Sequence, residues 1–278
     1  MKFTPKLADG DVNISKSHPL KEAAWLVGGL VLLMLMLYFS LGFLSGLIAM
    51  RLPVKAEIWI GSKISSVFEY DSNDYLQNHL DLLVKALPAD SSLHAYNFKI
   101  YLDESEQVNA MALPGGSIVV LKGLLKNIKS ENELDMVLAH ELGHFAHRDH
   151  LQAMGRGLLV VAASLLLPGD QSSDIVPWIA GKLERTYSQK QEAAADSWGI
   201  DLLNSRYGHV GGATDFFTRL AGKDKSHLSY FFATHPHPDY RIENLNKLIL
   251  QNHYVVGETI PLPNKKIIFK KPDEVRKQ

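Results

Sequence analysis

The chain has 278 residues and a net charge of −1 at pH 7, and 46% of its residues are hydrophobic. This length leaves room for one sizeable core and a membrane segment. The near-neutral charge argues against a nucleic-acid partner, and the absence of cysteine excludes disulfide bonds and thiol catalysis.

Two segments of different character open the chain. Residues 1–22 form a polar, lysine-bearing leader that we expect to be flexible. Residues 23–50 contain no charged side chain, and this run exceeds the roughly 20 residues that a helix needs to cross a bilayer. It also exceeds the apolar core of a cleavable signal peptide, which is about 7 to 15 residues long. We therefore predict a retained transmembrane helix that crosses the lipid bilayer once.

The residues around this helix bear on its orientation and its partners. Four lysines precede it, whereas Arg51, Lys55 and Lys63 follow it closely. By the positive-inside rule this small asymmetry favours a cytoplasmic N-terminus, with the rest of the chain on the non-cytoplasmic side. The spacing of Gly42 and Gly46 would let two such helices pack closely in a homo-oligomer, although glycine is frequent in membrane helices in any case.

Beyond Pro53 the sequence takes on the pattern of a soluble domain. Residues 57–69 carry β-branched side chains in short alternation and are expected to form a strand or a loop. Residues 74–87 have leucines at helical spacing and predict an amphipathic helix that ends at Pro88. Strand-like alternation recurs in three short segments around the turn signal Pro114-Gly115-Gly116, namely residues 96–102, 107–112 and 117–121. A small sheet is therefore predicted.

The next segment carries the motif His140-Glu141-Leu142-Gly143-His144. Ser130 followed by Glu133 has the form of a capping box, and apolar residues recur at helical spacing after it. If the segment is a helix, the spacing of four puts His140 and His144 on one face, so both imidazoles can reach one metal ion. Glu141 would then flank the metal.

Catalytic zinc usually takes three protein ligands and keeps a fourth position for water, so a third ligand must be found. The best candidate is Glu192, which shares a helix face with Asp196 in a segment rich in helix formers. Glu192 would bind the metal, and Asp196 would accept a hydrogen bond from the outer nitrogen of a ligand histidine. Taken singly, the histidine motif can arise by chance and the acidic pair can be a solvated face. Together, in order on two helices, they favour a metal site with Glu141 as the base.

Between the two ligand segments lies the apolar run 157–167, followed by a polar gap at residues 170–174. About eleven apolar residues are too few to span a bilayer. They suit a buried helix, or one that dips into the membrane face beside the site, and residues 157–180 leave both readings open. The second metal helix is expected over residues 182–204, and a further helix over residues 213–220 after a break at glycines.

Four elements together resemble one known family. They are the histidine motif, Glu-Ala-Ala-Ala-Asp at residues 192–196, the strand segment 108–125, and the His-Pro and Arg-Ile element at residues 234–242. In this order they resemble the membrane-bound zinc metallopeptidases that include the HtpX heat-shock proteases, the Oma mitochondrial protease and the CAAX prenyl endopeptidases, which are gluzincins. The resemblance extends from about residue 74 to about residue 250.

The resemblance implies further roles. His235, which could otherwise be a packed loop residue, would point at the open metal position. There it would either donate a hydrogen bond to the developing oxyanion or cover the metal in a resting state. Arg241 would anchor this loop by pairing with Asp239, and His237 would lie at the surface. His147 and His150 are left out of the site, because histidines at a helix end more often serve the helix dipole.

In zinc peptidases of this plan an edge strand holds the peptide substrate by main-chain hydrogen bonds. Our candidate for that edge is the run Asn109, Ala110, Met111 and Ala112, although a core strand with only a packing role fits the same residues. The family commonly has an arginine shortly before the ligand glutamate, where this chain has Gln189. We expect that departure to affect support of the site rather than its chemistry.

These expectations combine into one prediction. The fold is α+β, a mainly helical zinc-metallopeptidase domain at residues 54–255 with a small β-sheet beside the motif helix, preceded by the transmembrane helix and followed by a basic tail at residues 256–278. One Zn²⁺ per chain would activate water and polarise the peptide carbonyl, while Glu141 moves the proton. The predicted role is an endopeptidase acting on proteins or peptides in membrane or envelope quality control, in a bacterial inner membrane. The alternative is a membrane-tethered zinc-containing binding or chaperone-like factor without turnover, which would have no chemical need for Glu141.

Overall fold

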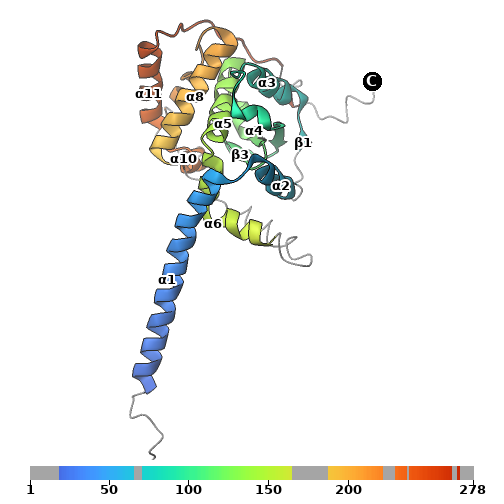
Figure 1. Ribbon diagram of the computed structural model, residues 1–278. Coiled ribbons are helices and arrows are strands. Elements are labelled where there is room, and N and C mark those ends of the chain that lie inside the picture. The colour runs from blue at the N-terminus through green and yellow to red at the C-terminus, as the bar shows by residue number, and fades with distance from the viewer. Residues whose placement is uncertain are drawn as a thin grey trace, which may run out of the picture. The chain divides into compact units, whose positions relative to one another are not determined.

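The computed structural model describes residues 19–65, 71–164, 187–221, 229–236, 238–264 and 268–269. The chain divides into two compact units, residues 1–44 and residues 45–278. The predicted apolar helix is present as α1, Pro19–Arg51, which is long and apolar enough to cross a membrane (Figure 1). Several expectations fall outside the described residues: most of the leader, the apolar run from residue 165 onwards with the gap at 170–174, His237, and much of the basic tail.

The expectation of a strand or loop over residues 57–69 is wrong in its first part, because Val54–Ser65 forms helix α2. Its buried residues are Glu57, Ile60, Gly61 and Ile64, which is helical spacing. This helical period is not evident in the sequence, because two of the four buried residues are a glutamate and a glycine rather than large apolar residues. The glycine is required, since a Cβ at Gly61 would lie 2.0 Å from the carbonyl oxygen of Pro114. Residues 66–70 lie outside the described part of the chain.

The small sheet is present and contains four strands in the order β1-β2-β4-β3. Its strands are β1 Asp71–Ser72, β2 Lys99–Asp103, β3 Ala110–Leu113 and β4 Ser117–Leu121. β2 and β4 pair in parallel, whereas β1 with β2 and β3 with β4 pair antiparallel. The predicted turn joins β3 to β4 and has positive φ at Gly115 and Gly116, of 86° and 89°. β3 is an edge of this sheet.

Helices supply most of the structure, so the predicted α+β class is confirmed (Figure 1). Beyond α1, α2 and the short 3₁₀ helix η1 (Ser92–Ala95), they are α3 Asp74–Lys85, α4 Lys122–Asn127, α5 Glu131–Ala146, α6 Asp149–Ser164, α8 Gln189–Tyr207, α9 Asp215–Ala221, α10 Ser229–Thr234 and α11 Pro238–Gln251. α6 is broken at Gly155, whose φ is 49°.

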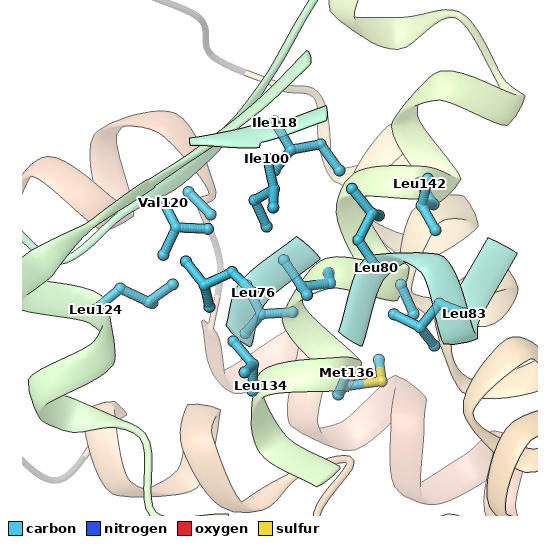
Figure 2. Packing of buried hydrophobic residues seen from close by; sticks show 14 of the residues in the cluster. Leu76, Leu80, Leu83, Ile100, Ile118, Val120, Leu124, Leu134, Met136 and Leu142 are labelled. Atoms are coloured by element: carbon cyan, nitrogen blue, oxygen red, sulfur yellow. The ribbon is translucent and has the colours of Figure 1, made fainter. Parts of the chain in front are cut away.

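The core lies between one face of the sheet and helices α3 and α5 (Figure 2). Leu76, Leu80 and Leu83 of α3 belong to the same buried cluster as Ile100 of β2 and Ile118 of β4. All five are at most 2% exposed, and α5 adds Leu134, Met136 and Leu142. Burial of this size stabilises by roughly 1.5 to 3 kcal/mol per large apolar side chain. The motif helix is therefore held on its apolar side by the core.

Helices α5 and α8 approach each other closely through glycine. A Cβ at Gly143 would lie 2.9 Å from the carbonyl oxygen of Ala195, and one at Gly199 would lie 3.1 Å from the backbone nitrogen of His140. The two helices that carry the metal-ligand candidates are thus in backbone contact. Glycine at residue 143 sets how near the two helices can come.

Past the predicted domain boundary at residue 255 the chain still contacts the domain. The backbone nitrogen of Glu131 donates to the carbonyl oxygen of Ile260 at 2.8 Å, and Ser130 pairs with Pro261. Farther on, Asn73 donates to the carbonyl oxygen of Ile268, a residue that is 2% exposed. These contacts tie the segment to the first turns of α3 and α5.

Candidate metal centre

Two capped helices present the site residues. Ser130 caps α5 as predicted, by accepting a hydrogen bond from the backbone nitrogen of Glu133 at 3.1 Å. The Glu133 carboxylate, however, accepts from the backbone nitrogen of Lys129 rather than from that of Ser130. Ser188 begins α8 at Gln189, later than residue 182, through a full capping box with Gln191. Both helix starts are therefore fixed by caps, that of α8 within one turn of Glu192 and that of α5 about two and a half turns before His140.

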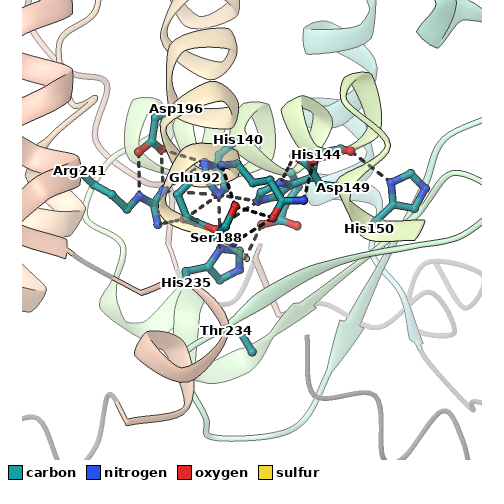
Figure 3. Close-up of polar contacts among 12 residues, drawn as sticks. His140, His144, Asp149, His150, Ser188, Glu192, Asp196, Thr234, His235 and Arg241 are labelled. Carbon is teal, nitrogen blue, oxygen red and sulfur yellow. Dashed lines mark hydrogen bonds and ion pairs between the residues drawn. The ribbon is translucent and has the colours of Figure 1, made fainter. Parts of the chain in front are cut away.

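Four buried side chains converge on one point from three parts of the chain (Figure 3). One ligand atom each from His140, His144, Glu192 and His235 lies within 4.8 Å of the others. The Nε2 atoms of His140 and His144 are 3.1 Å apart, and they lie 3.6 and 3.5 Å from the two carboxylate oxygens of Glu192. All four residues are at most 3% exposed. The structure thus brings together the three ligands expected from the two helices, with His235 beside them.

Each helix histidine has a carboxylate on its outer nitrogen. Nδ1 of His140 lies 2.9 Å from Asp196, the expected partner, and Nδ1 of His144 lies 3.1 Å from Asp149. An ionised carboxylate only accepts, so each outer nitrogen donates and a neutral ring turns a lone pair inward from Nε2. Two lone pairs facing each other at 3.1 Å, next to a third carboxylate, need a cation between them. Imidazole and carboxylate donors suit zinc, so the residues fit this metal.

The motifs in the sequence did not predict a role for Asp149, because it follows the end of α5. Its second oxygen accepts from the side chain of Gln191 at 2.9 Å, so it also connects α5 to the start of α8. Tyr187 was missed as well, and its ring stacks on that of His144 with centroids 3.7 Å apart. A search for an acceptor for the outer nitrogen of His144 would have pointed to Asp149.

Arg241 has a different partner from the one expected. Its guanidinium binds Asp196 with two hydrogen bonds of 2.8 and 2.6 Å, and its Nη1 lies 2.8 Å from Glu192. It is 1% exposed, whereas Asp239 lies at the surface. The predicted pair with Asp239 is therefore replaced by a buried link from α11 to α8, on the side of the site opposite Asp149 (Figure 3).

His235 follows α10 in a short loop that is held on two sides. Its Nδ1 is 3.0 Å from Glu192 and 3.4 Å from Nε2 of His140, and its Nε2 is 3.8 Å from Glu141. The preceding residue, Thr234, accepts from the backbone nitrogen of Tyr187 and donates to the side chain of Asn109. His235 therefore stands between the ligand glutamate and the candidate base.

The candidate substrate edge lies in the same region. Asn109 is buried just before β3, Ala110 and Ala112 are buried within it, and Met111 is partly exposed. β3 packs against α5, which carries the motif. Gln189, where the family has arginine, is exposed at the first position of α8.

Comparison with known proteins identifies the family. The model of peptidase family M48 matches residues 73–249, which contain every residue of the four-donor cluster. The chain belongs to peptidase family M48. The resemblance drawn from the four motifs is thereby confirmed.

Individual relatives of the chain are also named as metalloproteases. The metalloprotease LoiP of Escherichia coli is 30% identical over 182 residues, which are 63% of this chain and 71% of LoiP. The metalloprotease YcaL of the same organism is 29% identical over 204 residues, 70% of this chain and 76% of YcaL. The human mitochondrial metalloendopeptidase OMA1 is 28% identical over 190 residues, 62% of this chain but only 36% of OMA1. The chain is thus a metallopeptidase, and its metal is zinc.

Charge is balanced within this M48 site by its own residues. Burial raises the pKa of Glu192 and of Asp196, but Arg241 and the neighbouring histidines together outweigh burial, so both pKa values are lowered. For His140, burial and Arg241 together lower the pKa. Both carboxylates therefore stay ionised, and His140 stays neutral as a metal ligand must be.

His144 differs from His140 because it has no arginine beside it. Burial would lower its pKa, but hydrogen bonds to Asp149 and Glu192 raise that pKa to about 9. A histidine must be neutral to bind a metal, so the raised pKa of His144 opposes zinc binding at low pH.

Proposed function

We propose that this metallopeptidase is a membrane-anchored zinc endopeptidase in which His140, His144 and Glu192 bind the metal. The observation that carries the proposal is the pair of inward-facing Nε2 atoms, 3.1 Å apart, whose outer nitrogens both face carboxylates. Zinc, when bound, supplies a Lewis acid that activates water and polarises the peptide carbonyl. Asp196 and Asp149 orient the two histidines, and Arg241 holds Asp196 and Glu192.

Glu141 is the proposed general base. It is 1% exposed, follows the first ligand directly, and its Oε2 has no hydrogen-bond partner among the described residues. A buried carboxylate oxygen without a hydrogen-bond partner, next to the first ligand, is suited to take a proton from the attacking water and to deliver it to the leaving amine. A site that only held zinc for structural reasons would have no use for such an oxygen.

His235 is proposed as a latch in the resting enzyme. Its Nδ1 lies within hydrogen-bond distance of Glu192, at 3.0 Å, and its Nε2 lies 3.8 Å from Glu141. A fourth protein ligand is typical of closed zinc sites, whereas catalytic sites keep a position open. The loop that carries His235 must therefore move for substrate to enter. The alternative role, donation to the oxyanion, predicts the opposite effect of its removal.

The substrate would bind in extended form along Asn109, Ala110, Met111 and Ala112. Two features support this: β3 is an edge strand, and it packs against the motif helix. Main-chain pairing at a sheet edge reads the backbone of a peptide rather than its side chains. An endopeptidase that handles diverse unfolded proteins needs this kind of recognition.

Anchoring rests on α1, which has 33 residues and is long and apolar enough to cross a membrane. We propose a single membrane pass over residues 23–50, with the peptidase domain at residues 54–255 on the non-cytoplasmic side of a bacterial inner membrane. The family resemblance supports a setting in membrane or envelope protein quality control. Self-association through Gly42 and Gly46 stays a prediction.

The test is cleavage of casein, an unfolded protein, by the purified full-length chain in detergent. Wild type is compared with Glu141→Gln, with Glu133→Gln as a matched control on the same helix away from the cluster, and with wild type stripped by chelator and resupplied with zinc. We expect cleavage by wild type, by the control and after zinc is restored, and no cleavage by Glu141→Gln or by the stripped chain. Cleavage by Glu141→Gln at the rate of wild type would contradict the proposed base.

His235→Ala separates the two roles of this residue and addresses the alternative function. Faster cleavage than wild type supports a latch, and a loss of about 100-fold or more supports an oxyanion donor. A binding factor without turnover would retain casein in every variant and cut it in none, and Glu141→Gln would leave its affinity for casein unchanged.

A further inference from the structure

A second buried carboxylate network adjoins the zinc site without belonging to it. Glu57 of α2 is fully buried and lies outside the residues matched by the family model. Its Oε2 accepts from the hydroxyl of Tyr96 at 2.7 Å and from Arg148 at 2.9 Å. Its Oε1 accepts from His150 at 2.8 Å and from the backbone nitrogen of Gly115 at 3.2 Å. One carboxylate thus joins α2, the sheet and the end of the motif helix.

Two of these donors flank Asp149, the residue that holds His144. Arg148, Asp149 and His150 are consecutive at the junction of α5 and α6, and Glu57 binds the first and the third. Asp149, between them, lies 3.1 Å from Nδ1 of His144 (Figure 3). Fixing both neighbours of a residue fixes its backbone, and with it the direction of its side chain.

The backbone at this junction needs such support. Arg148 has a φ of 59°, a left-handed conformation that costs a non-glycine residue roughly 1 to 2 kcal/mol. Glycine would adopt it without strain but could not reach Glu57. An arginine therefore occupies a position where the backbone alone favours glycine.

His150 makes a second connection to the same ligand. Its Nε2 contacts Glu57, and its Nδ1 lies 3.2 Å from the backbone carbonyl oxygen of His144. Its ring also packs on Phe145 at 4.3 Å between centroids. The last turn of α5 is thus held from Glu57 through His150, in addition to the path through Asp149.

We propose that Glu57 is a positioning residue of the zinc site, which acts through Arg148 and His150 to aim Asp149 at His144. The proposal rests on the proposed zinc ligands. By this proposal α2 contributes to the zinc site of the peptidase, although the family match begins only at residue 73. In the sequence, α2 directly follows the apolar helix. Groups that orient a metal ligand typically change metal affinity by about 10- to 100-fold when altered.

The experiment measures zinc affinity of the full-length, metal-free chain in detergent by competition with a chelating indicator, alongside thermal unfolding. Glu57→Gln is compared with the matched control Asp135→Asn. Asp135 is also a fully buried carboxylate with several partners, among them His79 and Tyr207. It differs from Glu57 in lying on the first half of α5. We expect about a tenfold loss of zinc affinity for Glu57→Gln and none for Asp135→Asn, although both unfold at lower temperature.

A double-mutant cycle tests the path. If Glu57 acts through Asp149, Glu57→Gln should weaken zinc binding by less than twofold in an Asp149→Asn background. Should Glu57→Gln fail to fold, Arg148→Gly removes one of the two links to Glu57 while relieving the backbone, and should also weaken zinc binding. Unchanged zinc affinity in these variants, beside a wild type that binds zinc, would overturn this proposal alone. A wild type that bound no zinc would overturn the proposed function as well.

Discussion

Substituting alanine for Gly143 should disturb the zinc site more than it disturbs the fold. The added Cβ would lie 2.9 Å from the carbonyl oxygen of Ala195 and 3.0 Å from its Cα. Both are backbone atoms, so no side chain can rotate away. Helices α5 and α8 must separate instead, by about half an ångström to reach an ordinary contact. Because Glu192 is three residues before Ala195 on α8, that shift reaches the ligand directly.

The magnitudes favour a loss of binding over a loss of stability. Overpacking costs roughly 1 to 3 kcal/mol, but replacing glycine by alanine within a helix returns about 1 kcal/mol. The net destabilisation is therefore about 0 to 2 kcal/mol. Metal sites tolerate errors of only about 0.5 Å, so we expect zinc affinity to fall by about 10- to 100-fold, or about 1.4 to 2.8 kcal/mol.

The assay is zinc competition with a chelating indicator, together with thermal unfolding of the metal-free chain. Gly29→Ala is the matched control, because a Cβ at this helical glycine would meet nothing within 4 Å. Wild-type zinc affinity in Gly143→Ala would refute the idea that the spacing of α5 and α8 sets the ligand geometry. Equal losses in both variants would refute it too.

Three further predictions concern charge. Arg241→Met leaves two ionised carboxylates buried without their partner and should lower the free energy of unfolding by about 3 to 5 kcal/mol in urea titration; a loss below 1 kcal/mol would show that the buried pairs contribute little. Zinc affinity should rise with pH towards about 9, because zinc displaces a proton from His144; indicator titrations at pH 6 and 8 giving equal affinity would contradict this. Glu57 has a pKa lowered from 4.5 to about 2, where burial is outweighed by its hydrogen bonds, of which that from His150 is the strongest. Since the folded pKa is depressed, its contribution of about 3 kcal/mol is present above about pH 4.5 and is lost as the pH falls towards 2. The difference in unfolding free energy between wild type and Glu57→Gln should therefore shrink between pH 7 and pH 3, and a constant difference would be inconsistent with an ionised Glu57.

Features that depend on short stretches of chain were predictable. The spacing of His140 and His144 puts them on one face of any helix, and Ser130 marks where that helix begins. The turn at Gly115 and Gly116 needs positive φ, which glycine permits at no steric cost. The length of the apolar run at residues 23–50 likewise predicted α1 without any tertiary contact.

Choices among several chemically equivalent partners were decided only by the tertiary structure. Arg241 could have paired with its neighbour Asp239, but the packing of α11 against α8 brings it to Asp196. The sequence alone places Glu57 in a strand or loop. In the structure it lies on α2, which packs against the turn between β3 and β4, and it is buried there. Sequence periodicity fixes the direction of a side chain relative to its own helix. Which donor or acceptor it then meets depends on the distance and register between elements, and these are set by packing.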